Sequence, residues 1–187
     1  MKQNKLFTLP NILALIRVLL IPIFIVFYLN QTFYLDGGYP LYAILVFILA
    51  CVLDVVDGMV ARKYNSTTLL GKVLDPAADK LFRNGVLIAF TIKNVMPLYI
   101  VIILGVIDLV SIGLGIFLLT KKIVIKANML GKITTIVMSV SLFSCFLSDV
   151  IYPWNLVLVL ISVTMALISL IVYIVYFYKM YNLTVVK

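Results

Sequence analysis

Four aspartates lie close together between residues 54 and 79, in a stretch that is otherwise largely apolar. They are Asp54, Asp57, Asp75 and Asp79, and the whole chain has seven acidic residues. A carboxylate inside a membrane segment costs about 2.5 to 3.5 kcal/mol on insertion scales. Four carboxylates in one place also repel one another unless a positive group lies among them. One or two divalent metal ions are the simplest such group.

The spacing of the aspartates puts them on two helix faces. Asp54 and Asp57 are three residues apart, and Asp75 and Asp79 are four apart. Either spacing places both carboxylates on one face of a helix. Two such helices facing each other would form an oxygen-rich cage suited to Mg²⁺ or Mn²⁺. All four aspartates are therefore predicted metal ligands.

Small residues and an arginine accompany the carboxylates. Gly58, Ala61 and Gly71 allow a ligand to come close to the backbone, and Arg62 offers a planar fork suited to phosphate. The chain contains neither His nor Glu. Proton abstraction is therefore expected from an Asp, ahead of Lys or Tyr.

The composition is that of an integral membrane protein. Apolar residues make up 65% of the 187 residues, and the mean hydropathy is +1.23. A compact soluble domain of this size has too little interior to hide so much apolar surface. We expect one membrane domain over residues 1–187. The net charge of +8 is attributed to Lys and Arg that flank membrane helices, not to nucleic-acid binding.

The length and interruption of the apolar runs predict an all-α fold with six transmembrane helices. The expected ranges are about 11–29, 41–62, 71–92, 97–119, 129–148 and 154–178. Residues 1–9 mix Lys2 and Lys5 with apolar side chains. They form a predicted short amphipathic segment at the membrane surface, with a frayed terminus as the alternative.

The distribution of Lys and Arg predicts the topology. One set of helix ends carries most of these residues, whereas the other set carries only Lys93, with Asp36 and Asp149. Both termini are therefore expected on the cytoplasmic side. At ~1.5 Å per residue, the four aspartates lie in one layer roughly 6 to 12 Å below that surface. Arg17 reaches a similar layer.

The motif D-x-x-D-G-x-x-A-R, followed after eight residues by G-x-x-x-D-x-x-x-D, is complete from Asp54 to Asp79. In these residues the chain resembles the CDP-alcohol phosphatidyltransferases. The resemblance implies a fold of six membrane helices, usually present as a homodimer, and it covers nearly the whole chain.

The resemblance also implies a reaction. Members of the family cleave the diphosphate of a CDP-linked donor, transfer the phospho-alcohol group to an acceptor hydroxyl and release CMP. By position, Asp54, Asp57 and Asp75 hold the metals, and Asp79 is both near the metal and the base. Two Mg²⁺ or Mn²⁺ ions are expected in each site. The residues expected to bind the CDP donor are Asn11, Asp57, Gly58, Ala61, Arg62, Gly71 and Asp75.

Two further stretches suggest the subfamily. The sequence LPN at residues 9–11, followed by Arg17, resembles the P-N-x-x-T-x-x-R opening of phosphatidylglycerophosphate synthases and related cardiolipin synthases, with Ala14 in place of the Thr. Residues 131–135, GKITT, resemble a stretch of the same branch. Residues 107–108 read Ile-Asp where many phosphatidylglycerophosphate synthases carry Arg-Glu.

We therefore expect phosphatidyl transfer from CDP-diacylglycerol to glycerol 3-phosphate at the cytoplasmic face of a bacterial cell membrane. The predicted acceptor-binding residues are Arg17, Lys126 and Lys132. Phosphatidylglycerol, serine and inositol phosphate are alternative acceptors. Two other classes are a small ion-coupled transporter, whose carboxylates would lie near the membrane midplane, and an inactive scaffold, which the presence of all four aspartates argues against.

Overall fold

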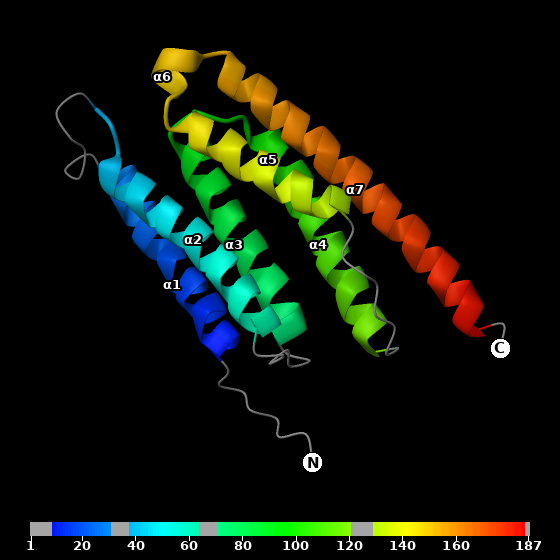
Figure 1. Ribbon diagram of the computed structural model, residues 1–187. Coiled ribbons are helices and arrows are strands. Elements are labelled where there is room, and N and C mark those ends of the chain that lie inside the picture. The colour runs from blue at the N-terminus through cyan, green and yellow to red at the C-terminus, as the bar shows by residue number, and fades with distance from the viewer. Residues whose placement is uncertain (1–8, 31–37, 64–70, 121–128, 186–187) are drawn as a thin grey trace. The chain divides into compact units, whose positions relative to one another are not determined.

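The computed structural model describes residues 9–30, 38–63, 71–120 and 129–185 (Figure 1). Within these ranges, the side chains of residues 9–10, 61–63, 71–75, 118–120 and 179–185 are not described. The chain forms two compact units, Met1–Val95 and Met96–Lys187, called here the N-terminal and C-terminal units. The predicted amphipathic segment lies outside the described residues, apart from Leu9.

Three long helices form the N-terminal unit. They are α1 (Leu9–Leu29), α2 (Leu41–Lys63) and α3 (Gly71–Ile92), and α1 packs against both of the others. Pro10 stands in the first turn of α1, where the missing N–H has no helical partner to lose. The start of α1, the end of α2 and the start of α3 lie at the same end of this unit (Figure 1). We call it the motif end.

Aromatic side chains hold the three helices together away from the motif end. The ring of Phe24 lies 6.0 Å from that of Phe82, and the rings of Tyr28 and Phe90 lie 5.0 Å apart, both pairs edge to face. Phe47 of α2 completes the cluster, 6.3 Å from Phe82. All five side chains are buried, and edge-to-face pairs stabilise such contacts beyond simple burial.

A glycine in α3 allows α1 to approach it. A Cβ atom on Gly85 would lie 2.6 Å from Cγ2 of Ile21, well inside the ~3.5 to 4.0 Å separation of packed carbon atoms. Small residues permit close packing of membrane helices in this way.

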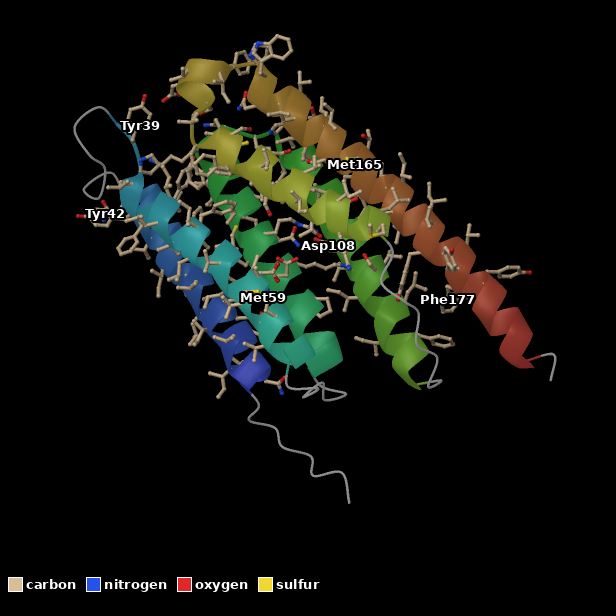
Figure 2. The ribbon with its side chains drawn as sticks, in the orientation of Figure 1. Tyr39, Tyr42, Met59, Asp108, Met165 and Phe177 are labelled. Atoms are coloured by element: carbon tan, nitrogen blue, oxygen red, sulfur yellow. The ribbon has the colours of Figure 1, made fainter. Side chains whose placement is uncertain are left out.

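The C-terminal unit contains α4 (Leu98–Thr120), α5 (Met129–Cys145), the short α6 (Ser148–Ile151) and α7 (Trp154–Val185). Both α4 and α5 pack against α7. Near the C-terminal ends of α4 and α7, Phe117 and Phe177 approach with their ring centroids 5.6 Å apart (Figure 2).

Hydroxyl groups line the contact between α5 and α7. The hydroxyl of Ser141 lies 3.0 Å from the carbonyl oxygen of Leu158 in α7 and 2.7 Å from that of Val137 in its own helix. The hydroxyl of Ser162 lies 3.4 Å from the sulfur of Met138. These small polar side chains let the two helices lie close together, as is common between membrane helices.

The observed helices begin and end close to the predicted boundaries. The main difference is at the fifth predicted helix, 129–148, where α5 ends at Cys145 and α6 follows. At this point Phe146 and Leu147 donate backbone hydrogen bonds to Phe143 and Ser144, three residues earlier, at 3.1 and 3.0 Å. Such bonds tighten the last turn of a helix. The sixth predicted helix continues past residue 178, since no Gly or Pro interrupts it.

Among the described residues, four helices are long and apolar enough to cross a membrane. Their apolar spans are Asn11–Leu29, Leu41–Val60, Leu98–Phe117 and Trp154–Tyr178. The prediction of an all-helical membrane protein is therefore confirmed. The helix α5 is a shorter apolar helix of 17 residues. The helix α3 carries most of its charged residues in the half nearest the motif end, where Asp75 and Asp79 lie.

Candidate active site

Arg17 of α1 joins the two motif aspartates of α2. Its Nη1 lies 2.9 Å from Oδ1 of Asp54, and its Nη2 lies 2.5 Å from Oδ2 of Asp57. Because Asp54 and Asp57 are about one helical turn apart, a single planar guanidinium reaches both. The contact links α1 to α2 and gathers two carboxylates on one cation.

The three charged side chains differ in burial. Arg17 is 1% exposed and Asp57 is 6% exposed, whereas Asp54 is 41% exposed. A buried charge is tolerated in protein only when it is paired and hydrogen-bonded. Arg17 and Asp57 are therefore the buried part of this cluster, and Asp54 is its exposed part.

The sequence of α1 brings Arg17 to this position. Asn11, Ala14 and Arg17 follow at intervals of three residues, share one face of the helix and are all buried. This face lies among three helices, because α1 packs on both α2 and α3. At Ala14, a methyl group requires no hydrogen-bond partner, whereas a buried hydroxyl would.

The oxygens of Asp54 and Asp57 fit a divalent cation. They already converge on one positive group, and carboxylate oxygens are the ligands that Mg²⁺ and Mn²⁺ prefer. Two carboxylates are not a complete ligand set. Among the side chains that the structure describes, no cluster of three or more Asp, Glu, His or Cys residues could hold a metal ion. The side chain of Asp75 is outside this set.

Asp79 lies on α3 at a matching distance from the motif end. It follows Gly71, the first residue of α3, by eight residues, while Asp54 and Asp57 precede Lys63, the last residue of α2, by nine and six. Its side chain is half-buried. The layer of carboxylates expected from the sequence is compatible with this register. Figure 2 labels two residues of α2. Tyr42 lies in its first turn, and Met59, two residues after Asp57, lies toward the motif end.

The residues predicted to bind the CDP donor occupy the same helix ends. Gly58 follows Asp57 directly and is half-buried. The others lie in the last turn of α2 or the first two turns of α3, and only their backbone is described. They are Ala61, Arg62, Gly71 and Asp75.

The predicted acceptor lysines belong to the C-terminal unit. Lys132 is exposed in the first turn of α5, and Lys126 lies outside the described residues. The hydroxyls of Thr134 and Thr135 donate to the carbonyl oxygens of Leu130 and Gly131 at 2.8 and 3.1 Å. These two hydroxyls therefore satisfy the backbone of α5, which is a common role of Thr within a helix.

The contact of Arg17 with Asp54 and Asp57 was not anticipated from the sequence, which assigned Arg17 to an acceptor phosphate. A usable signal was present, because Arg17 was expected at the depth of the aspartates. Charges inside a membrane segment usually pair with one another. Arginine and carboxylates at one depth on adjacent helices therefore favour an ion pair.

The chain matches known proteins over most of its length. A family model described as CDP-alcohol phosphatidyltransferase matches residues 7–181. The CDP-diacylglycerol–glycerol-3-phosphate 3-phosphatidyltransferase of Aquifex aeolicus is 37% identical over 165 residues, which are 87% of each chain. The protein of the same name from Bacillus subtilis is 38% identical over 138 residues, covering 70% of this chain and 72% of the relative.

A relative with another name is also similar. The cardiolipin synthase (CMP-forming) of Streptomyces coelicolor is 35% identical over 106 residues, covering 55% of this chain and 47% of its own. The family match includes both units and every candidate residue from Asn11 to Lys132. Together with the complete aspartate motif, this match shows that the chain belongs to the CDP-alcohol phosphatidyltransferase family.

Proposed function

We propose that this protein transfers the phosphatidyl group of CDP-diacylglycerol to glycerol 3-phosphate, which yields phosphatidylglycerophosphate and CMP. The relatives from Aquifex aeolicus and Bacillus subtilis carry the name of this reaction at 37% and 38% identity. The structural observation that carries the proposal is that Asp54 and Asp57 both contact one positively charged group, the guanidinium of Arg17. A diphosphate donor requires such a concentrated site for positive charge.

The proposed site holds two Mg²⁺ or Mn²⁺ ions on the four motif aspartates. When bound, these ions neutralise the diphosphate and stabilise the entering and leaving oxygens. The chemistry of the proposed metal ligands supports this assignment, because all four are carboxylates and His is absent from the chain.

Asp79 is the proposed general base. It accepts the proton of the acceptor hydroxyl, whose oxygen then forms a bond to the phosphorus of the phosphatidyl group. The bond from that phosphorus to the oxygen of CMP breaks, and CMP leaves. The support for Asp79 is its register on α3, which matches that of Asp54 and Asp57 on α2.

Small and polar residues are proposed to bind the two substrates. Gly58 and Gly71 leave room for the cytidine part of the donor, and Arg62 is suited to its phosphates. Asn11, Asp57, Ala61 and Asp75 complete the proposed donor site. Arg17, Lys126 and Lys132 are the proposed ligands of the acceptor phosphate. We propose a cytoplasmic site because Lys63 and Lys72 flank the motif end, and a homodimer from the family resemblance.

The test is a transfer assay on membranes that contain the protein. Labelled CDP-diacylglycerol is supplied with glycerol 3-phosphate, phosphatidylglycerol, serine or inositol phosphate, and both lipid product and CMP are measured. Glycerol 3-phosphate should give the fastest transfer, and chelation of divalent metal should stop it. Transfer to another acceptor, with none to glycerol 3-phosphate, would refute the acceptor assignment. Absence of metal-dependent CMP release with every acceptor would favour a transporter or a scaffold.

A second candidate is cardiolipin synthesis, with phosphatidylglycerol as the acceptor. The similarity to the Streptomyces coelicolor protein favours it. The same acceptor panel distinguishes the two, since phosphatidylglycerol would then be the preferred acceptor.

A further inference from the structure

We propose that Arg17 is an internal counter-ion, which holds Asp54 and Asp57 together in the metal-free protein and competes with the divalent metal for Asp54. This inference rests on the proposed role of both aspartates as metal ligands. It assigns to Arg17 a positioning role in metal loading.

The geometry shows why a counter-ion is needed. Two carboxylates one turn apart on the same helix repel each other, and Asp57 is almost completely buried. The guanidinium of Arg17 lies between them and neutralises part of their charge. In the absence of metal, it keeps the oxygens converged.

The two halves of the guanidinium are held differently. Nη2 donates a hydrogen bond to Oδ2 of Asp57. Nη1 is close to Asp54, but neither Nη1 nor Nε has a hydrogen-bond partner among the residues that the structure describes. The link to Asp54 is therefore an ion pair without hydrogen-bond geometry, and Asp54 is also the more exposed carboxylate. Metal should take Asp54 first and leave Arg17 on Asp57.

Metal loading then changes what Arg17 can bind. A metal that binds Oδ1 of Asp54 at about 2.0 to 2.1 Å would take the place of Nη1 on that oxygen. Nη1 is then released from Asp54, and together with Nε, which has no hydrogen-bond partner among the described residues, it can bind an oxyanion at the site. This order of events accounts for the predicted role of Arg17 toward an acceptor phosphate, because Nη1 leaves Asp54 only once the metal is in place.

Mn²⁺ binding by the purified full-length protein in detergent tests the competition. Free Mn²⁺ is measured by electron paramagnetic resonance for the wild type, Arg17→Gln and Arg17→Lys. Arg17→Gln should bind Mn²⁺ about tenfold more tightly, which corresponds to ~1.4 kcal/mol. Arg17→Lys should lie between the two, because a single ammonium is a point charge that lacks the fork needed to bridge both carboxylates.

A matched control removes a charge elsewhere in the same unit. Lys93 lies beyond the last residue of α3, at the end opposite the motif end, so Lys93→Gln should bind Mn²⁺ with wild-type affinity. Unchanged or weaker binding by Arg17→Gln would overturn the competition.

Thermal unfolding gives a second readout that does not depend on activity. The rise of the midpoint between chelator and saturating Mn²⁺ should be larger for Arg17→Gln than for the wild type, because the variant depends more on metal to neutralise its carboxylates. An equal rise in both proteins would contradict the proposal. If Arg17→Gln does not fold, Arg17→Lys serves in both measurements, with the same expected direction.

The double variant Asp54→Asn with Asp57→Asn separates this inference from the proposed function. Loss of Mn²⁺ binding in the double variant, with wild-type affinity in Arg17→Gln, would reject the role of Arg17 and leave the metal assignment intact. Wild-type Mn²⁺ binding in the double variant would reject the metal assignment and the competition with it.

Discussion

The contact between α1 and α2 in the N-terminal unit and the contact between α5 and α7 in the C-terminal unit use polar groups in different ways. An ionic contact joins α1 to α2, with Arg17 of α1 on two carboxylates of α2. In the C-terminal unit, α5 and α7 meet through neutral hydroxyls that bond to carbonyl oxygens or to sulfur. A buried ion pair often contributes no more stability than an apolar contact of the same volume. The ionic cluster is therefore better explained by chemistry, and the hydroxyl contacts by packing.

The largest effect is expected at the proposed base. Asp79→Asn should lower the rate of CMP release by about 10²- to 10⁴-fold, since an amide cannot accept the proton of the acceptor hydroxyl. The thermal midpoint should change little, because Asn has nearly the same volume. The measurement is CMP release with saturating CDP-diacylglycerol and glycerol 3-phosphate. A rate within twofold of the wild type would remove Asp79 from the reaction and weaken the contrast between the units.

Packing in the N-terminal unit gives the next effect. Gly85→Ala places a methyl group 2.6 Å from the branched side chain of Ile21, and overpacking of this kind costs about 1 to 3 kcal/mol. The gain in helix propensity from Gly to Ala is only about 1 kcal/mol. We expect a lower midpoint of thermal unfolding in detergent.

Gly105 of α4 provides the matched control for Gly85. A Cβ atom there meets no heavy atom within 4 Å in the described part of the chain, so Gly105→Ala should keep or raise the midpoint. Equal midpoints for the two variants would mean that α1 and α3 separate enough to accept the methyl group.

Lys132, proposed to bind the acceptor phosphate, should affect binding more than the chemical step. Lys132→Gln is expected to raise the KM for glycerol 3-phosphate about tenfold, or ~1.4 kcal/mol, with kcat retained at saturation. The KM for CDP-diacylglycerol should not change, which makes it the internal control. A fall in kcat with an unchanged KM would instead place Lys132 among the groups that act in the transition state.

The helices α1, α2, α4 and α7 were predictable because each is a long apolar run bounded by Gly, Pro or polar residues. The break between α5 and α6 was not, since no Gly or Pro marks it and the tightened turn at Phe146 and Leu147 is set by backbone hydrogen bonds. The motif aspartates are singled out by residue type and spacing, and the structure brings two of them, Asp54 and Asp57, onto the guanidinium of Arg17. The partner of Asp54 and Asp57 was missed, because it depends on how α1 packs on α2, which periodicity within either helix does not specify.

The smallest expected effect concerns the hydroxyls between α5 and α7. Ser141→Ala removes the contact with the carbonyl oxygen of Leu158, and such interhelical bonds contribute about 0.6 kcal/mol on average in membrane proteins. We expect a small fall in the unfolding free energy, measured by titration with a denaturing detergent. The control is Ser139→Ala. The hydroxyl of Ser139 donates a hydrogen bond to the carbonyl oxygen of Thr135 in its own helix, so its loss should hardly change the stability. A fall in unfolding free energy as large as that of Gly85→Ala in the same titration would show that hydroxyls stabilise the C-terminal unit as strongly as close packing stabilises the N-terminal one. Since an interhelical hydrogen bond contributes about 0.6 kcal/mol on average and overpacking costs about 1 to 3 kcal/mol, we expect the smaller value for Ser141→Ala.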